Sequence, residues 1–175
     1  MFNNPSKKIA YIGLFSALVM ISTLLIQIPT ITKGYVHLGD ALVYLSGIFL
    51  GPLAGLLSAG IGSALADLAS GYAVYAPATF LVKGLDALVV AASYNILSRS
   101  FAKNKMIAAL LAFTLGGLVM IAGYLFYESF LYGFAVALTG VPANLIQAIT
   151  GVIIALPLFA VLEKNPLLNK LRDSF

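Results

Sequence analysis

The chain has 175 residues, of which 61% are hydrophobic and 9% are charged, and its mean hydropathy is +1.03. Soluble domains carry about 25% charged residues, so this chain could not cover a surface that faces water, and we expect one integral membrane domain over residues 1–175. Because cysteine is absent and the single histidine and scattered acids have no metal-ligand spacing, we expect no disulfide, metal ion or cofactor. The net charge of +4 would suit nucleic acid, but the positions of the basic residues indicate membrane topology instead.

Apolar segments in chain order predict the membrane-crossing helices. They are Ile9–Ile28, Ala41–Leu50, Leu53–Ala66, Ala78–Leu97, Met106–Tyr127 and about Val141–Leu162. Most approach the roughly 20 apolar residues that a span needs. The first is longer than the ~7–15 residues of a signal-peptide core and is followed by no small-residue cleavage site, so we expect a retained helix.

The second and third segments form either one long helix or two helices that separate at Gly51-Pro52. Proline removes a backbone donor and clashes with the preceding turn, which favours a break. With a break, eight of the ten basic residues lie on the cytoplasmic side, as the positive-inside rule requires. These eight are Lys7, Lys8, Arg99, Lys103, Lys105, Lys164, Lys170 and Arg172. The sequence therefore predicts an all-α membrane protein, a bundle of six transmembrane helices with cytoplasmic N- and C-termini.

Small residues form two smooth helix faces. Gly51, Gly55, Ala59, Ser63 and Asp67 recur at every fourth position, which favours close packing inside the bundle. Near the N-terminus, Ala10, Gly13 and Ala17 form a second such face, which either packs internally or docks another membrane protein.

Ionisable residues gather toward the outer side of the predicted bundle. They are His37, Asp40, Asp67, Lys83, Asp86 and Glu128. Charged groups in hydrocarbon are costly and mark candidate functional sites. Lys83 and Asp86 share a helical face, so they form either a structural ion pair, with or without Asp67, or a ligand contact. For Asp40 the simpler interpretation, a cap at the start of a helix, is favoured.

Six of the nine tyrosines also lie toward the outer side: Tyr35, Tyr72, Tyr75, Tyr124, Tyr127 and Tyr132. An interfacial belt explains several of them, but a belt would appear on both faces of the membrane. Asn144 and Gln147 add amide groups at the same level. A small, flat, polar molecule could stack on tyrosine and hydrogen-bond to amides and carboxylates there.

Several functions lack their sequence signature. No phosphate loop is present, so the chain should not hydrolyse ATP by that route. A single histidine excludes the intramembrane metalloproteases, and Asp67 with Asp86 is a thin basis for an aspartyl protease. A stand-alone secondary transporter would favour inverted repeats or a polar path to the cytoplasm, and the sequence has neither. We therefore expect a binding protein, not an enzyme, that relies on partners for energy.

Five short motifs resemble those of the substrate-binding S components of energy-coupling factor (ECF) vitamin transporters. The motifs are Gly34-Tyr35-Val36-His37-Leu38-Gly39-Asp40, Gly51-Pro52-Leu53-Ala54-Gly55, Gly62-Ser63-Ala64-Leu65-Ala66-Asp67, Tyr75-Ala76-Pro77-Ala78-Thr79 and Lys83-Gly84. The resemblance implies a subunit of the prokaryotic plasma membrane that binds a vitamin from outside. It also implies docking on a transmembrane T component driven by two cytoplasmic ATPases, with toppling in the bilayer to release the vitamin. Gly13-x-x-x-Ala17 stands where such proteins have an alanine pair for docking, and residues Pro29 to Tyr35 would form a lid.

The motifs look most like the group assigned to pyridoxine-type vitamers or hydroxymethylpyrimidine. The outer region carries four acids against two lysines and one histidine, which disfavours an anionic ligand and suits a ring nitrogen or exocyclic amine. Neutral riboflavin is the alternative. The expected substrate-binding residues are Tyr35, Asp67, Tyr75, Lys83, Asp86, Tyr124, Tyr127, Glu128, Asn144 and Gln147, with none catalytic.

Overall fold

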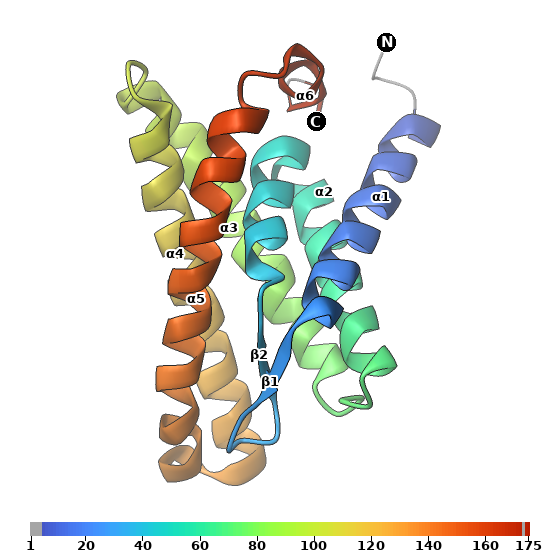
Figure 1. Ribbon diagram of the computed structural model, residues 1–175, viewed down its shortest axis with the longest axis vertical. Coiled ribbons are helices and arrows are strands. Elements are labelled where there is room, and N and C mark those ends of the chain that lie inside the picture. The colour runs from blue at the N-terminus through green and yellow to red at the C-terminus, as the bar shows by residue number, and fades with distance from the viewer. Residues whose placement is uncertain (1–4, 173) are drawn as a thin grey trace.

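The computed structural model describes residues 5–172 and 174–175, which are nearly all helical (Figure 1). The helices are α1 (Pro5–Leu25), α2 (Asp40–Ala69), α3 (Ala76–Ser100), α4 (Lys105–Tyr132), α5 (Phe134–Leu162) and α6 (Pro166–Arg172). A short antiparallel hairpin of β1 (Gln27–Pro29) and β2 (Tyr35–His37) connects α1 to α2. Within the described part of the chain, α1 to α5 are each long and apolar enough to cross a membrane. The chain is therefore a multi-pass membrane protein.

Helix α2 is divided at Gly51, whose φ of 74° and ψ of −177° are not helical, and Pro52 follows directly. A Cβ atom added at Gly55 would lie only 2.8 Å from the Cα of Gly47. Eight residues of a straight helix rise about 12 Å, so the chain folds back at Gly51, as the reversal from cyan to teal in Figure 1 shows. The predicted break at Gly51-Pro52 is confirmed. That the two halves act as two membrane spans stays a prediction.

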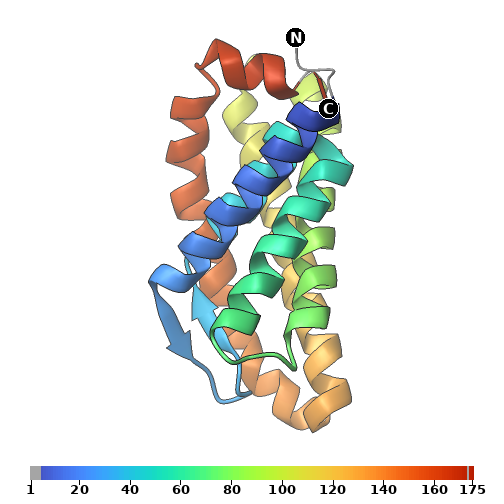
Figure 2. The same ribbon diagram turned by 90° about the vertical axis from the view of Figure 1, so that its right-hand side faces the viewer.

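The first half of α2, residues 40–50, is only about 16 Å long, roughly half the hydrocarbon thickness of a bilayer. The β1–β2 hairpin lies beyond its start, toward the lower end of the molecule in Figures 1 and 2. We had expected helix to continue to Ile28, but α1 ends at Leu25. The residue before a proline avoids helical angles, so Pro29 disfavours helix at Ile28 and the segment pairs as a strand instead.

Two further boundaries differ from the predictions. Helix α5 begins at Phe134, well before Val141, and includes Pro142. The predicted segment already contained Pro142, and the helix extends seven residues further toward the N-terminus than predicted. Helix α6 was not predicted, and it begins at Pro166, where a missing backbone donor has no cost in the first turn.

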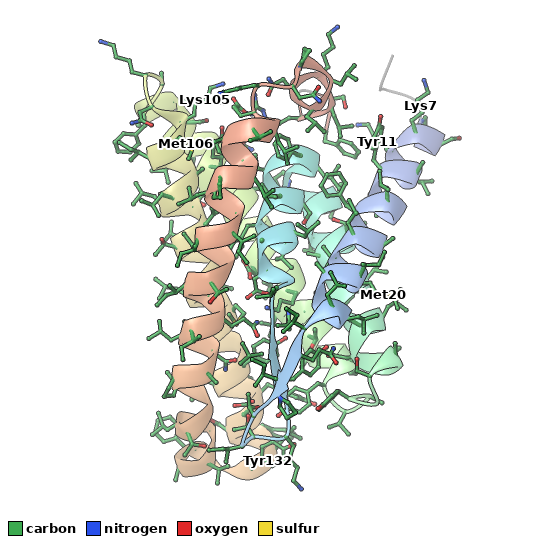
Figure 3. All side chains as sticks on the ribbon, viewed as in Figure 1. Lys7, Tyr11, Met20, Lys105, Met106 and Tyr132 are labelled. Carbon is green, nitrogen blue, oxygen red and sulfur yellow. The ribbon has the colours of Figure 1, made fainter. Side chains whose placement is uncertain are left out.

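The two ends of the bundle differ in content. The start of α1, α6 and the end of the chain lie together, with Lys7 and Lys105, while Tyr132 lies at the opposite end (Figures 1 and 3). At the basic end, Glu163 pairs with Lys105 at 2.5 Å and with Arg172 at 2.8 Å. The half of the core nearer this end is filled by buried aromatic rings, among them Tyr44, Phe49, Phe113 and Phe159.

The stripe of small residues on α2 is buried along its whole length, from Gly51 to Asp67. This confirms the prediction that it packs inside the bundle. Side chains beyond glycine would not fit at its closest contacts, since a Cβ at Gly55 would meet the backbone of the other half of α2. The polar residues of the interior lie toward the hairpin end of the bundle.

A polar pocket beneath the hairpin

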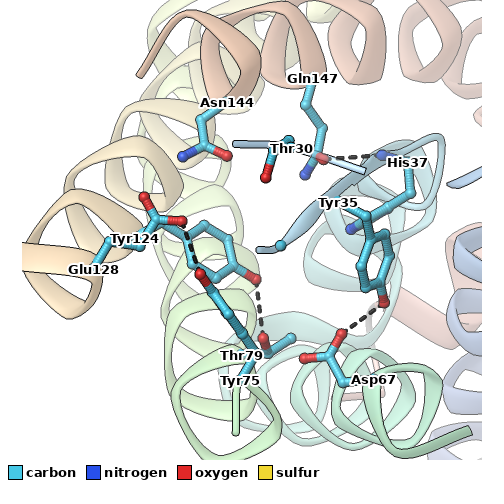
Figure 4. A pocket seen from close by; sticks show the side chains of 11 residues that line it. Thr30, Tyr35, His37, Asp67, Tyr75, Thr79, Tyr124, Glu128, Asn144 and Gln147 are labelled. Atoms are coloured by element: carbon cyan, nitrogen blue, oxygen red, sulfur yellow. Dashed lines mark hydrogen bonds between the residues drawn. The ribbon is translucent and has the colours of Figure 1, made fainter. Parts of the chain in front are cut away.

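A small cavity of about 30 Å³ lies between the hairpin and helices α2 to α5 (Figure 4). Its lining residues are Thr30, Gly34, Tyr35, His37, Asp67, Tyr75, Thr79, Tyr124, Glu128, Asn144 and Gln147. A buried water needs about 10–15 Å³ of such space, so the closed cavity holds one or two waters. A larger molecule would fit only if the hairpin or the lining side chains moved outward.

Seven of the ten predicted site residues line this cavity: Tyr35, Asp67, Tyr75, Tyr124, Glu128, Asn144 and Gln147. That they contact a ligand stays a prediction. The prediction omitted Thr30, Gly34, His37 and Thr79. Thr79 is one helical turn from Lys83 and could have been found by spacing, whereas Thr30 and Gly34 reach the cavity only because the hairpin folds over it.

Lys83 does not line the cavity. It is fully buried and forms an ion pair with Asp40 of α2, which is also fully buried. Lys83 thus belongs to a structural ion pair, but the alternative that paired it with Asp86 is wrong, and so is the interpretation of Asp40 as a helix cap. Gly39 occupies the cap position of α2 with no side-chain hydrogen bond, while the Asp40 carboxylate accepts hydrogen bonds from Lys83 and from Gln147.

Asp86 and Tyr127 also lie outside the cavity lining. Both carboxylate oxygens of Asp86 are buried and accept no hydrogen bond from the described residues, and one oxygen packs against Gly116 of α4. The Tyr127 hydroxyl donates to the backbone carbonyl of Val74, and its ring meets that of Tyr75 edge-on at 5.5 Å. Tyr127 thus packs against Tyr75 without itself lining the pocket.

Three tyrosine hydroxyls at the pocket already donate hydrogen bonds within the protein, as Figure 4 shows in part. Tyr35 donates to Oδ1 of Asp67 at 2.6 Å, and Tyr124 donates to the Thr79 hydroxyl at 3.2 Å. Tyr75 lies 2.5 Å from the carbonyl oxygen of Thr32 and 3.3 Å from Oε1 of Glu128. A hydroxyl has one proton, so Tyr75 donates its hydrogen bond to the nearer acceptor, the carbonyl oxygen of Thr32.

The carboxylates of the pocket consequently have free acceptor capacity. Oδ2 of Asp67 and Oε2 of Glu128 are buried without a hydrogen-bond partner among the described residues. Thr79 lies near Asp67 and Thr32 near Glu128, but neither hydroxyl completes a hydrogen bond to these two oxygens. Buried acceptors without donors are costly. The pocket therefore suits a ligand that brings N–H or O–H groups.

His37 contributes no positive charge to the pocket. Burial, with a smaller contribution from the Lys83 charge, lowers its pKa to about 4 against the opposing effect of Asp40. Its Nδ1 atom accepts a hydrogen bond from the Gly39 backbone N–H at 3.0 Å, which requires an unprotonated nitrogen. Burial, and then the hydrogen bond to Asp67, raise the pKa of Tyr35, so its hydroxyl stays a donor. At neutral pH, the groups lining the pocket are neutral or acidic.

A cavity lined by acceptors and tyrosines, set at one end of membrane-crossing helices, defines a membrane protein with a candidate site for a small polar molecule. A family model described as "ECF-type riboflavin transporter, S component" matches residues 3–164. The chain therefore belongs to this family of ECF transporter S components, and it is a transmembrane transport protein. The resemblance found in the sequence motifs is confirmed at this level.

Two relatives cover nearly the whole chain. An "Uncharacterized protein in gap 3'region" from Pyrococcus woesei is 35% identical over 148 residues, which is 84% of this chain and 95% of that protein. The thiamine precursor transporter HmpT of Lactococcus lactis subsp. cremoris (strain MG1363) is 24% identical over 177 residues, covering 99% of this chain and 98% of the relative. The family description and the second relative thus carry different substrate names.

Proposed function

We propose that this chain is the vitamin-binding subunit of an ECF-type importer in a prokaryotic plasma membrane. It captures a small ring-containing vitamin of the pyridoxine, pyridoxal or hydroxymethylpyrimidine type from the extracellular side. The observation that carries the proposal is the pair of buried carboxylates, Asp67 and Glu128, whose unpartnered oxygens accompany tyrosines and amides in one cavity. The two carboxylates lie on different helices, α2 and α4, so a ligand between them would join separate parts of the bundle.

The chemistry of the cavity favours this substrate class. A ring with an exocyclic amine or a hydroxymethyl group donates hydrogen bonds to carboxylate oxygens, and such charge-assisted bonds are roughly twice as strong as neutral ones. The flat ring would pack against the tyrosines, which offer both an apolar face and a polar tip. The Lactococcus relative, a thiamine precursor transporter, supports the same class.

Riboflavin is the second candidate, and the family description favours it. Its three fused rings and ribityl chain are much larger than a single ring. Both candidates exceed a closed cavity of about 30 Å³, so the hairpin would have to move outward for either of them. The smaller ligand needs the smaller movement, and we prefer it for that reason.

The partners in this proposal are a transmembrane T component and two cytoplasmic ATPases, against which the subunit topples to release its cargo. The surface suited to docking is the face of α1 formed by Ala10, Gly13 and Ala17, all of which are exposed. A Cβ added at Gly13 would meet nothing within 4 Å, so another helix could approach the backbone closely. In this arrangement the basic end of the bundle faces the cytoplasm, as the positive-inside rule requires.

Calorimetric binding to the purified, detergent-solubilised chain tests the proposal. The panel holds pyridoxine, pyridoxal, pyridoxamine, hydroxymethylpyrimidine, thiamine, riboflavin, pantothenate and biotin. We expect tight, saturable binding of one single-ring compound and none of pantothenate. Binding of riboflavin alone would select the second candidate, and no binding by a folded chain would refute both. Uptake into liposomes by the chain alone would instead indicate a stand-alone transporter.

A further inference from the structure

Gln147 lines the cavity, but its amide is bonded to the protein on both sides. Its Oε1 accepts the backbone N–H of His37 in β2 at 3.0 Å, and its Nε2 donates to Oδ2 of Asp40 at 3.0 Å. Figure 4 shows the first of these bonds reaching from α5 to the hairpin. Because this N–H is directed to α5, it does not contribute to pairing between the two strands. A single side chain thus joins α5, β2 and the start of α2.

The Asp40 end of this connection is rigidly held. Lys83 of α3 pairs with the other carboxylate oxygen of Asp40. The side chains of Lys83, Asp40 and Gln147 are each only 0–1% exposed. One turn beyond Gln147, a Cβ at Gly151 would lie 2.8 Å from the Cβ of Asp40, so α5 and α2 are in close contact at this height. The platform below Gln147 therefore has little freedom to move.

The His37 end belongs to a short hairpin that is held to the helices by single side-chain contacts, such as Tyr35 with Asp67 and Gln27 with Ser70. Strand β2 has three residues, and its neighbour Tyr35 supplies both a wall of the cavity and the hydrogen bond to Asp67. Two-stranded hairpins are only marginally stable by themselves. The position of β2, and with it the shape of the cavity, depends on attachments to the helices.

We infer that Gln147 is a positioning residue that fixes β2 to the buried Asp40–Lys83 pair and so holds the hairpin closed over the pocket. It acts on the ligand through His37 and Tyr35 rather than by giving its amide to the ligand. The inference deepens the proposed function and rests on it for its bearing on a ligand. Its structural part, the attachment of the hairpin, can be tested with no ligand present.

The experiment compares hydrogen–deuterium exchange across residues 35–39 in the unliganded chain, reconstituted in lipid nanodiscs. In Gln147→Met the side chain keeps its length and loses both hydrogen bonds, and we expect exchange there to accelerate about tenfold. The matched control is Asn144→Leu, three residues earlier on α5, which lines the same cavity and makes no hydrogen bond to the other residues drawn in Figure 4. In this control we expect exchange across residues 35–39 to match the unmodified chain.

With pyridoxine or hydroxymethylpyrimidine as the probe, whichever the calorimetric panel shows to bind, Gln147→Met should also raise the dissociation rate by a similar factor. Unchanged exchange with weakened binding would overturn the inference, since Gln147 would then be a direct ligand contact. Unchanged exchange and unchanged binding would overturn it as well. Gln147→Asn, which keeps the amide but cannot span both partners, provides a milder second variant, and failure of both to fold would assign Gln147 to overall stability instead. If no vitamin binds, the exchange result still decides the role of Gln147.

Discussion

The buried ion pair between Lys83 and Asp40 provides the most direct test of the structure. Lys83→Met keeps the approximate length of the side chain and removes its ammonium group. The carboxylate of Asp40, which is 0% exposed, then keeps only the hydrogen bond from the amide of Gln147 at 3.0 Å. Removing one partner of a buried pair costs about 3–5 kcal/mol, because the other charge is left uncompensated. The ring of Tyr124, whose centroid is 5.6 Å from the Lys83 nitrogen, would lose a cation contact too. We therefore expect the free energy of unfolding to fall by about 4 kcal/mol.

The chain has no tryptophan and no cysteine, so unfolding is best followed by circular dichroism of the helices during titration with SDS in mixed micelles. In the double variant Lys83→Met/Asp40→Asn both charges are gone, and we expect most of the loss to be recovered, to within about 2 kcal/mol of the unmodified chain. Lys105→Met is the matched control, since its pair with Glu163 is 45% exposed on the lysine side and should be worth at most about 1 kcal/mol. The reasoning would be refuted if Lys83→Met lowered the free energy of unfolding by less than about 1 kcal/mol. It would also be refuted if the losses in Lys83→Met and Asp40→Asn simply added up to the loss in the double variant.

Three further predictions follow from the same core and pocket. In Asp86→Asn a buried acid that accepts no hydrogen bond from the described residues becomes a neutral amide, so the melting temperature should stay within about 2 °C, and a large drop would show that the charge is needed. His37 has a folded pKa of about 4 against about 6.5 when unfolded, so the unfolded chain binds the proton first as pH falls. The free energy of unfolding should thus decline from pH 6.5 toward pH 4 by up to about 3 kcal/mol. His37→Gln should remove this contribution to the pH dependence, and an equal pH dependence in both chains would contradict the low pKa of His37. Finally, the phosphate ester of the bound vitamin should bind at least about a hundredfold more weakly than the free alcohol, because Asp67 and Glu128 repel the phosphate. Competition calorimetry measures the two affinities, and equal values would contradict the polarity assigned to the pocket.

The sequence predicted the helices best where hydropathy and backbone chemistry agree. Apolar runs located the membrane-crossing segments, and Gly51-Pro52 located the reversal in α2, because only glycine adopts a φ of 74° without strain and proline cannot continue the first half. The hairpin was not predictable by these means. Its strands have three residues each, and their pairing depends on contacts with helices far along the chain.

Candidate site residues were found by their depth in the predicted bundle, and this criterion brought seven of them to one cavity. Their partners were a harder problem. Spacing along one helix suggested Lys83 with Asp86, whereas the ammonium pairs with Asp40, 43 residues away. The rotation of α3 against α2 and α4 decides between these two acids, and the close contact of Asp86 with Gly116 shows that its carboxylate faces α4. A single sequence does not contain that rotation.

The placement of the ion pair also explains how one small bundle can be both rigid and accessible. Packed aromatic rings and close glycine contacts fill the half nearer the basic end, and the Asp40–Lys83 pair lies between that half and the pocket. Opening the pocket from within the helices would expose or separate buried charges, at a cost of several kcal/mol. Moving the hairpin requires only the loss of single hydrogen bonds, such as those made by Tyr35, Tyr75 and Gln147, each worth about 1 kcal/mol. We therefore expect a ligand to enter by movement of the hairpin and not of the helices.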